Sequence, residues 1–234
     1  MSISANAAHV QERIVAACRR CGRKSDEVAL MAVSKTFSAA RIREAYDAGL
    51  RLFGESRIQE FAAKSEALRD LSDAQWHMIG HLQTNKAAKA AELFSAVDSL
   101  DSLRLAEKLN AAAGLSGKKL AVLIEINLGG ETAKSGLARD SQELQEILEA
   151  ASSLESLEIR GLMTVPPFTE DPEGSRPFFR TLRDLRDRIA ARRLPAVAMD
   201  VLSMGMSHDF EVAIAEGSTC VRVGTAIFGD RIRD

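Results

Sequence analysis

Short apolar runs alternate with longer amphipathic stretches along this chain, and this alternation restricts the fold more than any other feature of the sequence. The apolar runs have the length and composition of strands, and the stretches between them are rich in Ala, Leu, Glu and Arg, as helices are. The expected strands are Val28–Val33, Arg51–Phe53, Gln75–Ile79, Phe94–Val97, Leu120–Asn127, Leu157–Met163, Ala198–Leu202 and Thr219–Val223. Repeated strand–helix units favour a parallel sheet of the α/β class.

The stretches between the strands carry helix start and stop signals. Ser38 can cap a helix over Ala39–Ala48, and Gly49 follows it where helices commonly end. The other expected helices are Ser56–Leu71, Asn85–Leu93, Ser102–Ala113, Ser141–Ala151, Pro172–Arg192 and Ser207–Glu216. A further helix over about Ala5–Cys21 precedes the first strand. Because little chain follows the last strand, we expect this extra N-terminal helix to take the place of an eighth outer helix.

The two strongest apolar runs read LAVLIEINL and CVRVGTAIF and are almost continuously apolar. Strands that helices cover on both faces have this character. Eight of them joined by helices predict a (β/α)8 TIM barrel, with residues 1–234 forming a single domain. A doubly wound open sheet is the alternative, and the absence of G-x-G-x-x-G after the first strand counts against it.

Charge and cysteine content exclude several classes of function. The chain has 31 Lys and Arg against 33 Asp and Glu, so it lacks the cationic excess that nucleic-acid backbones require. It has neither an apolar run of about 20 residues for a membrane span nor a signal-peptide pattern, so we expect a cytoplasmic protein. Cys18, Cys21 and Cys220 form no disulfide framework. His81 and His208 have no metal-spaced partners, so no metal site is predicted.

Lys35 ends the first expected strand, at the barrel face where active sites lie. A lysine that is partly removed from water there has its charged form disfavoured and can act as a nucleophilic amine. Such an amine is what a Schiff base to an aldehyde requires. The alternative is a strand-end lysine that extends its ammonium group into solvent.

Small residues follow the seventh and eighth strands, where many barrels bind phosphate. The segment SMGMS from Ser203 supplies hydroxyl groups and Gly205, and Gly224 with Thr225 supplies backbone N–H groups and a hydroxyl. Two tight turns would give the same pattern. Together with a reactive lysine, however, a phosphate site in one barrel mouth suggests pyridoxal 5′-phosphate (PLP) as the cofactor.

Arg222 lies two residues before Gly224 and therefore on the same face of the strand. Its guanidinium group could meet the pyridine nitrogen of PLP, where a cation weakens the ring as an electron sink. The alternative is an arginine paired with a carboxylate across the barrel. His77 shares a face with Ile79, so it is either a side chain near the ring or a core histidine with satisfied hydrogen bonds.

Six segments in order resemble the pyridoxal phosphate homeostasis protein family, small PLP-binding proteins related to the N-terminal barrel of alanine racemase. They read AVSKTF, FGESRIQE, WHMIGHLQTNKAAKA, EINLGGETAKSGL, IRGLMTVP and LSMGMSHDFEVAIAEGSTCVRVGTAIFGDR, from about Val28 to Arg231. The resemblance implies that Lys35 forms the Schiff base with PLP. It also implies PLP contacts for His77, Ser203 with the turn around Gly205, Arg222, Gly224 and Thr225.

The resemblance implies a carrier that binds PLP and releases it to acceptor enzymes, with little or no catalysis. Alanine racemase uses a tyrosine of a second domain as its second base, and the only tyrosine here, Tyr46, lies in the helix after the first strand. We therefore expect a monomeric protein of PLP and amino-acid homeostasis. One alternative is a PLP-dependent amino-acid racemase that uses Lys35 with His77 or water. The other is a cofactor-free barrel enzyme acting on a phosphorylated sugar or aldehyde.

The sequence leaves the roles of three further residues open. Ser56 stands where the family commonly has Asn, and His81 stands where it often has Pro. A serine is shorter than an asparagine, so a direct contact of Ser56 with the cofactor is in doubt. Lys134 is a candidate second amine for PLP, against the alternative of a solvated loop side chain.

Overall fold

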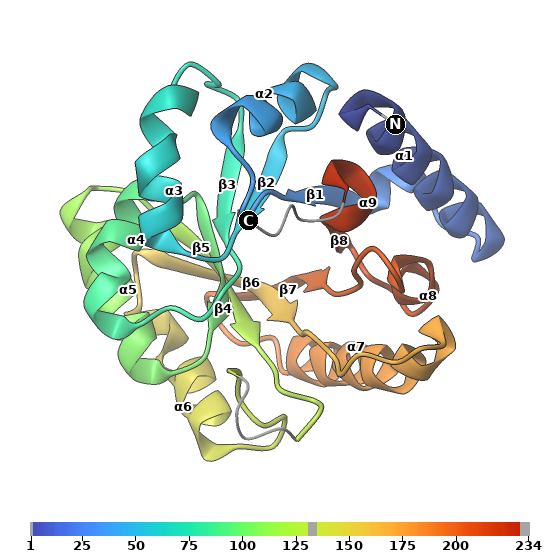
Figure 1. The fold of residues 1–234 in the computed structure, drawn as a ribbon. Coiled ribbons are helices and arrows are strands. Elements are labelled where there is room, and N and C mark those ends of the chain that lie inside the picture. Colours follow the sequence, from blue (N-terminus) through green and yellow to red (C-terminus); the bar gives the residue numbers. More distant parts are fainter. Residues whose placement is uncertain (1, 131–134, 230–234) are drawn as a thin grey trace.

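Parallel strands close into a barrel in the computed structural model, which describes residues 2–130 and 135–229 (Figure 1). Within these ranges each strand pairs with the next in chain order, and the last pairs with the first. The strands are β1 (Ala29–Val33), β2 (Leu52–Glu55), β3 (Gln75–Met78), β4 (Ala96–Leu100), β5 (Leu120–Glu125), β6 (Leu157–Met163), β7 (Val197–Ser203) and β8 (Cys220–Val223). The predicted (β/α)8 barrel is thereby confirmed.

Helices surround the barrel, and serine caps define several of their starts. Ser2, Ser38, Ser102 and Ser141 each accept a hydrogen bond from a backbone N–H of the first helical turn. The helices are α1 (Ile3–Arg20), α2 (Ala39–Asp47), α3 (Ile58–Ser65), α4 (Ala87–Leu93), α5 (Leu103–Leu115), α6 (Gln142–Ala150), α7 (Arg176–Ala191), α8 (Phe210–Ala215) and α9 (Thr225–Phe228). Short 3-10 turns cover Ser25–Glu27, Glu66–Leu68, Thr84–Lys86, Ala151–Ser153 and Pro172–Ser175. In the parts of the chain described, no helix has the length and apolar character needed to cross a lipid bilayer.

The extra N-terminal helix lies on the outside of the barrel, where it was expected. α1 packs against α8, α9 and α2, and it buries Val10 and Ile14 completely. The side-chain amide of Asn6 donates to the carbonyl of Ile227 at 2.9 Å, which joins α1 to α9. The short helix α9 itself was not predicted, because only a single turn follows the last strand before Gly229.

The boundaries of several elements differ from the prediction. β5 ends at Glu125 rather than Asn127, and Ile126 continues only as an isolated bridge to Leu137. The helix expected over Ser56–Leu71 is instead α3 followed by a 3-10 turn. The helix expected from Pro172 opens with a 3-10 turn before α7 begins.

An aromatic cluster on the outside of β2 and β3 fixes the position of α3. The ring of Phe61, in α3, lies 4.8 Å from the ring of Trp76 and 5.0 Å from that of Phe94, and Trp76 also stacks on Phe53 at 4.9 Å. Rings at these separations pack with favourable geometry. The cluster therefore holds α3 firmly beside the loop that follows β1.

The inside of the barrel is polar near its carboxyl end, in contrast to this outer layer. Asp98, Ser203 and Arg222 are each almost fully buried there, at 1%, 0% and 3% exposure. Buried polar groups are costly unless they are hydrogen-bonded, so their presence marks this end of the barrel as a functional one.

Candidate functional site

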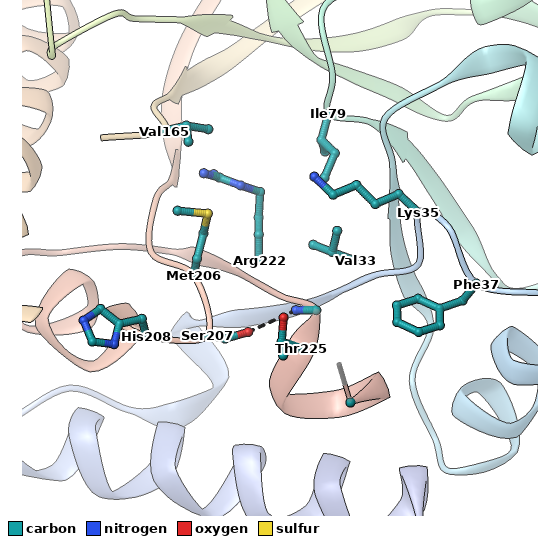
Figure 2. Close-up of a pocket in the computed structure, with 12 residues that line it drawn as sticks. Val33, Lys35, Phe37, Ile79, Val165, Met206, Ser207, His208, Arg222 and Thr225 are labelled. Carbon is teal, nitrogen blue, oxygen red and sulfur yellow. Dashed lines mark hydrogen bonds between the residues drawn. The ribbon is translucent and has the colours of Figure 1, made fainter. Parts of the chain in front are cut away.

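A cavity of about 280 Å³ opens at the carboxyl ends of the strands (Figure 2). Its lining comes from the first strands, the loop after β6, and the turns around β7 and β8. The lining residues are Val33, Lys35, Phe37, Ile79, Val165, Met206, Ser207, His208, Arg222, Gly224, Thr225 and Gly229. The structure thus brings together four of the predicted site residues: Lys35, Arg222, Gly224 and Thr225.

Lys35 supplies the amine of the cavity. It follows β1 by two residues, and the alternation of side chains along the strand directs it to the inside of the barrel with Val33. Figure 2 shows its side chain extending into the cavity toward Ile79. The residue is partly buried, as predicted for an amine partly withdrawn from water.

Arg222 supplies the fixed cation of the cavity. Its guanidinium group donates to Ser203 Oγ and to the Thr164 carbonyl oxygen, both at 2.7 Å. Burial lowers the pKa of Arg222 from its ordinary value, although an arginine remains charged in proteins. The two hydrogen bonds hold the planar group in one orientation at the cavity wall.

Ser207, Gly224 and Thr225 line the opposite end of the cavity. Ser207 Oγ accepts from the N–H groups of Gly224 and Ala226, both at 3.3 Å. Since this oxygen is used as an acceptor twice, its own hydrogen is available to donate to an anion in the cavity. An added Cβ on Gly224 would lie 3.4 Å from Val33, so a side chain there would point toward the wall of the same cavity.

Ser203 and Gly205 lie near this end but do not line the cavity. Ser203 is fully buried and accepts from Arg222. Gly205 has a φ of +94°, and an added Cβ would lie 2.5 Å from the Cβ of Ala213, in α8. Its carbonyl oxygen accepts from the N–H of Arg222 at 2.9 Å. Both residues therefore support Arg222 and the packing of α8, whereas Ser207 is the serine of the turn that faces the cavity.

His77 lies on the inside of the barrel and is likewise absent from the cavity lining. Its Nδ1 atom lies 3.0 Å from Oδ1 of Asp98, which is 1% exposed. Sequence reasoning missed Asp98 as a partner, although an acidic residue inside the apolar stretch FSAVD is an unusual signal. This carboxylate fixes the imidazole ring of His77.

A second cavity of about 580 Å³ adjoins the first and shares Ile79 and Val165 with it. Glu125 lines it, 7% exposed, and accepts from Ser135 Oγ at 3.0 Å. Burial raises the pKa of Glu125. His81 also lines this cavity, with its Nδ1 atom 2.9 Å from Oδ2 of Asp101.

Ser56 does not line the first cavity. The backbone of Ser56 lies directly against Gly80: a Cβ added to Gly80 would come within 2.4 Å of the Ser56 carbonyl oxygen. Ser56 thus supports the turn after β3. Lys134 lies outside the described residues. Over residues 2–130 and 135–229, no three His, Cys, Asp or Glu side chains gather as a metal site would require.

Known proteins resemble this chain over almost its whole length. The family model of the alanine racemase N-terminal domain matches residues 6–232. A pyridoxal phosphate homeostasis protein of Aquifex aeolicus is 47% identical over 222 residues, which cover 95% of each chain. The protein of that name in Escherichia coli is 43% identical over 231 residues, which cover 98% of this chain and 97% of that one.

Solved structures show the same relation. The structure of PipY from Synechococcus elongatus with PLP bound is similar with a TM-score of 0.81 and 40% identity, covering 94% of this chain and 100% of that one. The alanine racemase of Streptomyces coelicolor is similar with a TM-score of 0.69 at 20% identity, covering 94% of this chain and 57% of that one. This second likeness shows the shared barrel fold alone.

Proposed function

The chain belongs to the pyridoxal phosphate homeostasis proteins, within the alanine racemase N-terminal domain family, and from this premise we propose that it binds PLP in the cavity of Lys35 and maintains the PLP supply of the cell. One observation carries the proposal. An amine, a fixed guanidinium group and a hydroxyl–amide anion site line a single cavity, at Lys35, Arg222 and Ser207 with Gly224. The PLP-bound structure of PipY supports it.

The residues present fit the chemical groups of PLP. The volume of about 280 Å³ lies near the lower end of the range of about 300–1,000 Å³ usual for small-molecule sites. Ile79, Val165 and Met206 give the cavity apolar walls that suit an aromatic ring. The cavity thus combines an amine, a cation and an anion site with apolar walls between them, as a phosphorylated pyridine aldehyde requires.

We assign the aldehyde of PLP to Lys35 and its phosphate to the opposite end of the cavity. When bound, PLP supplies an aldehyde that combines reversibly with an amine and a ring that withdraws electrons. Lys35 is the residue that would hold this aldehyde as a Schiff base. Ser207 would donate its hydroxyl hydrogen to the phosphate, with the hydroxyl and backbone N–H of Thr225 beside it. Ser203, which the sequence assigns to the phosphate together with the following turn, accepts a hydrogen bond from Arg222 in the structure.

Arg222 favours storage of the cofactor over catalysis. A permanent cation beside the ring nitrogen disfavours protonation of that nitrogen, and an unprotonated ring is a weak electron sink. The names of the relatives, which describe homeostasis, agree with this role. We therefore propose a monomeric carrier whose partners are PLP itself and, transiently, the PLP-dependent enzymes that receive it.

The visible absorption spectrum of the purified protein with added PLP tests this function. The wild type should show the band of a protein-bound Schiff base, and Lys35→Ala should lack it. A Lys89→Ala variant is the matched control, since it changes an exposed lysine that pairs with Glu92 on the surface of α4. Absence of the band from the wild type would contradict PLP binding through an amine.

His208 favours one second candidate, an amino-acid racemase. In Figure 2 its ring lies on the other side of the cavity from Lys35, and its Nε2 atom is 3.0 Å from the Glu170 carbonyl oxygen. A base on each side of a bound ring is what racemisation needs. Formation of D-amino acids from L-amino acids, abolished in both Lys35→Ala and His208→Ala, would establish the racemase. We expect no turnover in either variant or in the wild type.

A further inference from the structure

A second lysine, Lys64, lies behind the loop that carries Lys35. It belongs to α3, and its side chain is only 10% exposed. Its ammonium group lies 2.8 Å from Oε1 of Glu55 and 3.1 Å from Oε1 of Glu60. Glu55 is fully buried, so this group of charges, which we call the α3 cluster, is largely withdrawn from water.

The ammonium group of Lys64 also holds the backbone on both sides of Lys35. It donates to the carbonyl oxygens of Ser34 and Phe37, each at 3.2 Å. These carbonyls lie one residue before and two residues after Lys35. A single charged donor therefore closes the loop around the reactive residue, and hydrogen bonds from charged groups are among the stronger ones in proteins.

The two carboxylates of the α3 cluster bind the same loop. Glu55 Oε1 accepts from the hydroxyl of Ser34 at 2.5 Å, and Glu60 Oε1 accepts from the backbone N–H of Thr36 at 2.5 Å. Thr36 has a φ of +70°, a conformation that a β-branched residue rarely adopts. The loop thus stands in a strained conformation that the cluster holds in place.

The cluster is itself rigid, because α3 is fixed from outside. The packing of Phe61 on Trp76 and Phe94 holds this helix to β3 and to the end of α4. Glu60 and Lys64 lie on either side of Phe61 in the helix, so their carboxylate and ammonium groups have little freedom to follow a moving loop.

We propose that Lys64 is a positioning residue for Lys35: through the loop backbone, with Glu55 and Glu60, it sets where the Lys35 amine meets the aldehyde of PLP. This inference rests on the proposed function. Release of the loop from the α3 cluster lets Thr36 relax from its positive φ, and the amine of Lys35 moves with it. A displacement of about 1 Å at a reacting group can reduce reactivity about a hundredfold.

The test compares PLP with pyridoxine 5′-phosphate, which carries a hydroxymethyl group where PLP carries its aldehyde. The dissociation constants of both ligands are measured for the wild type, Lys64→Met and the surface control Lys89→Met. In Lys64→Met the affinity for PLP should fall about 10- to 100-fold, while the affinity for pyridoxine 5′-phosphate stays at the wild-type value. Lys89→Met should bind both ligands as the wild type does.

Glu60 provides a second pair of variants if Lys64→Met does not fold. Glu60→Ala removes the acceptor for Thr36 and should reproduce the selective loss of PLP affinity. Glu60→Gln keeps an oxygen at that position and should restore most of it. Melting temperatures without ligand confirm that each variant is folded.

Two outcomes would overturn the inference without touching the proposed function. One is an equal loss of affinity for both ligands in Lys64→Met and Glu60→Ala, which is the mark of a merely structural role. The other is unchanged PLP affinity in both variants. Failure of the wild type to bind PLP would instead overturn the proposed function, and this inference with it.

Discussion

The two ends of the cavity are built in different ways. At the Lys35 end, the amine lies at the tip of a long side chain, and charged side chains from α3 hold the loop beneath it. At the Ser207 end, the N–H groups of Gly224 and Ala226 hold the Ser207 hydroxyl oxygen, and α8 packs closely on Gly205. An amine that must react and release needs its backbone fixed but its side chain mobile, whereas an anion is bound best by groups that do not move.

This difference predicts that the two ends can be damaged separately. Changes at the Ser207 end should weaken every ligand that carries the phosphate. Changes at the Lys35 end should weaken only ligands that carry the aldehyde. We make three predictions about these two ends and about the buried carboxyls, ordered by the size of the expected effect.

Gly205→Ala should have the largest effect. The new methyl group would stand 2.5 Å from Ala213 Cβ, and alanine is strained at a φ of +94°. We expect a loss of about 2–4 kcal/mol in the free energy of unfolding, measured by urea denaturation. Gly22→Ala is the control, since Gly22 has a φ of +70° but open space around it, so it carries only the backbone penalty. Equal losses in the two variants would show that packing of α8 on Gly205 is not decisive.

Ser207→Ala should have an intermediate effect, confined to ligand binding. Removal of the hydroxyl takes away a donor to the phosphate and an acceptor for Gly224 and Ala226. Affinity should fall about 5- to 10-fold, the value of one hydrogen bond of about 1 kcal/mol, for both PLP and pyridoxine 5′-phosphate. A loss restricted to PLP, measured by fluorescence titration, would break the proposed separation of the two ends.

Glu125→Gln should have the smallest effect on folding stability. It concerns a buried carboxyl that can be compared with Glu55 of the α3 cluster. Both Glu55 and Glu125 are buried carboxyls whose Oε2 atoms have no hydrogen-bond partner within the described chain. They differ in that Glu55 pairs with the ammonium group of Lys64, whereas no ammonium group of the described residues pairs with Glu125. Burial raises the pKa of Glu125 above its ordinary value of 4.5. The stability linked to this raised pKa is therefore present below about pH 4.5 and lost as the pH rises through the folded-state pKa.

Because glutamine does not ionise, Glu125→Gln removes the loss of folding stability that Glu125 causes as the pH rises. The variant should exceed the wild type in the free energy of unfolding near neutral pH, and the difference should shrink toward acid pH. Glu216→Gln should show the opposite trend: although burial raises the pKa of Glu216, hydrogen bonds from Arg176 and Arg180 outweigh it and lower the pKa. Parallel pH profiles of the two variants, measured by urea denaturation, would contradict the assigned directions.

The sequence predicts the barrel and one half of the cavity well, for a physical reason. Alternation along a strand has a period of two, so the position of Arg222 relative to Gly224, or of Lys35 relative to Val33, already determines which side chains point inward. Their places follow from local geometry alone.

The remaining contacts depend on how elements pack against one another, which periodicity does not reveal. Ser203 and Ser207 are equivalent in the pattern SMGMS, and only the path of the turn decides which hydroxyl faces the cavity. Lys64 reads as an ordinary polar residue on a helix surface. It meets Glu55 and the loop of Lys35 because the aromatic packing of Phe61 sets the orientation of α3.

The position of α9 has a consequence for the order of events during synthesis. Phe228 of this last helix stacks on Phe37 in the loop of Lys35 at 4.7 Å, and Arg41 donates to the Phe228 carbonyl oxygen. Residues near 37 and 228 are far apart in the sequence, so they meet only after both have left the ribosome, and such distant contacts form late in folding. A nascent chain that has not yet reached residue 228 therefore lacks this contact, and we expect PLP to bind only after the contact has formed.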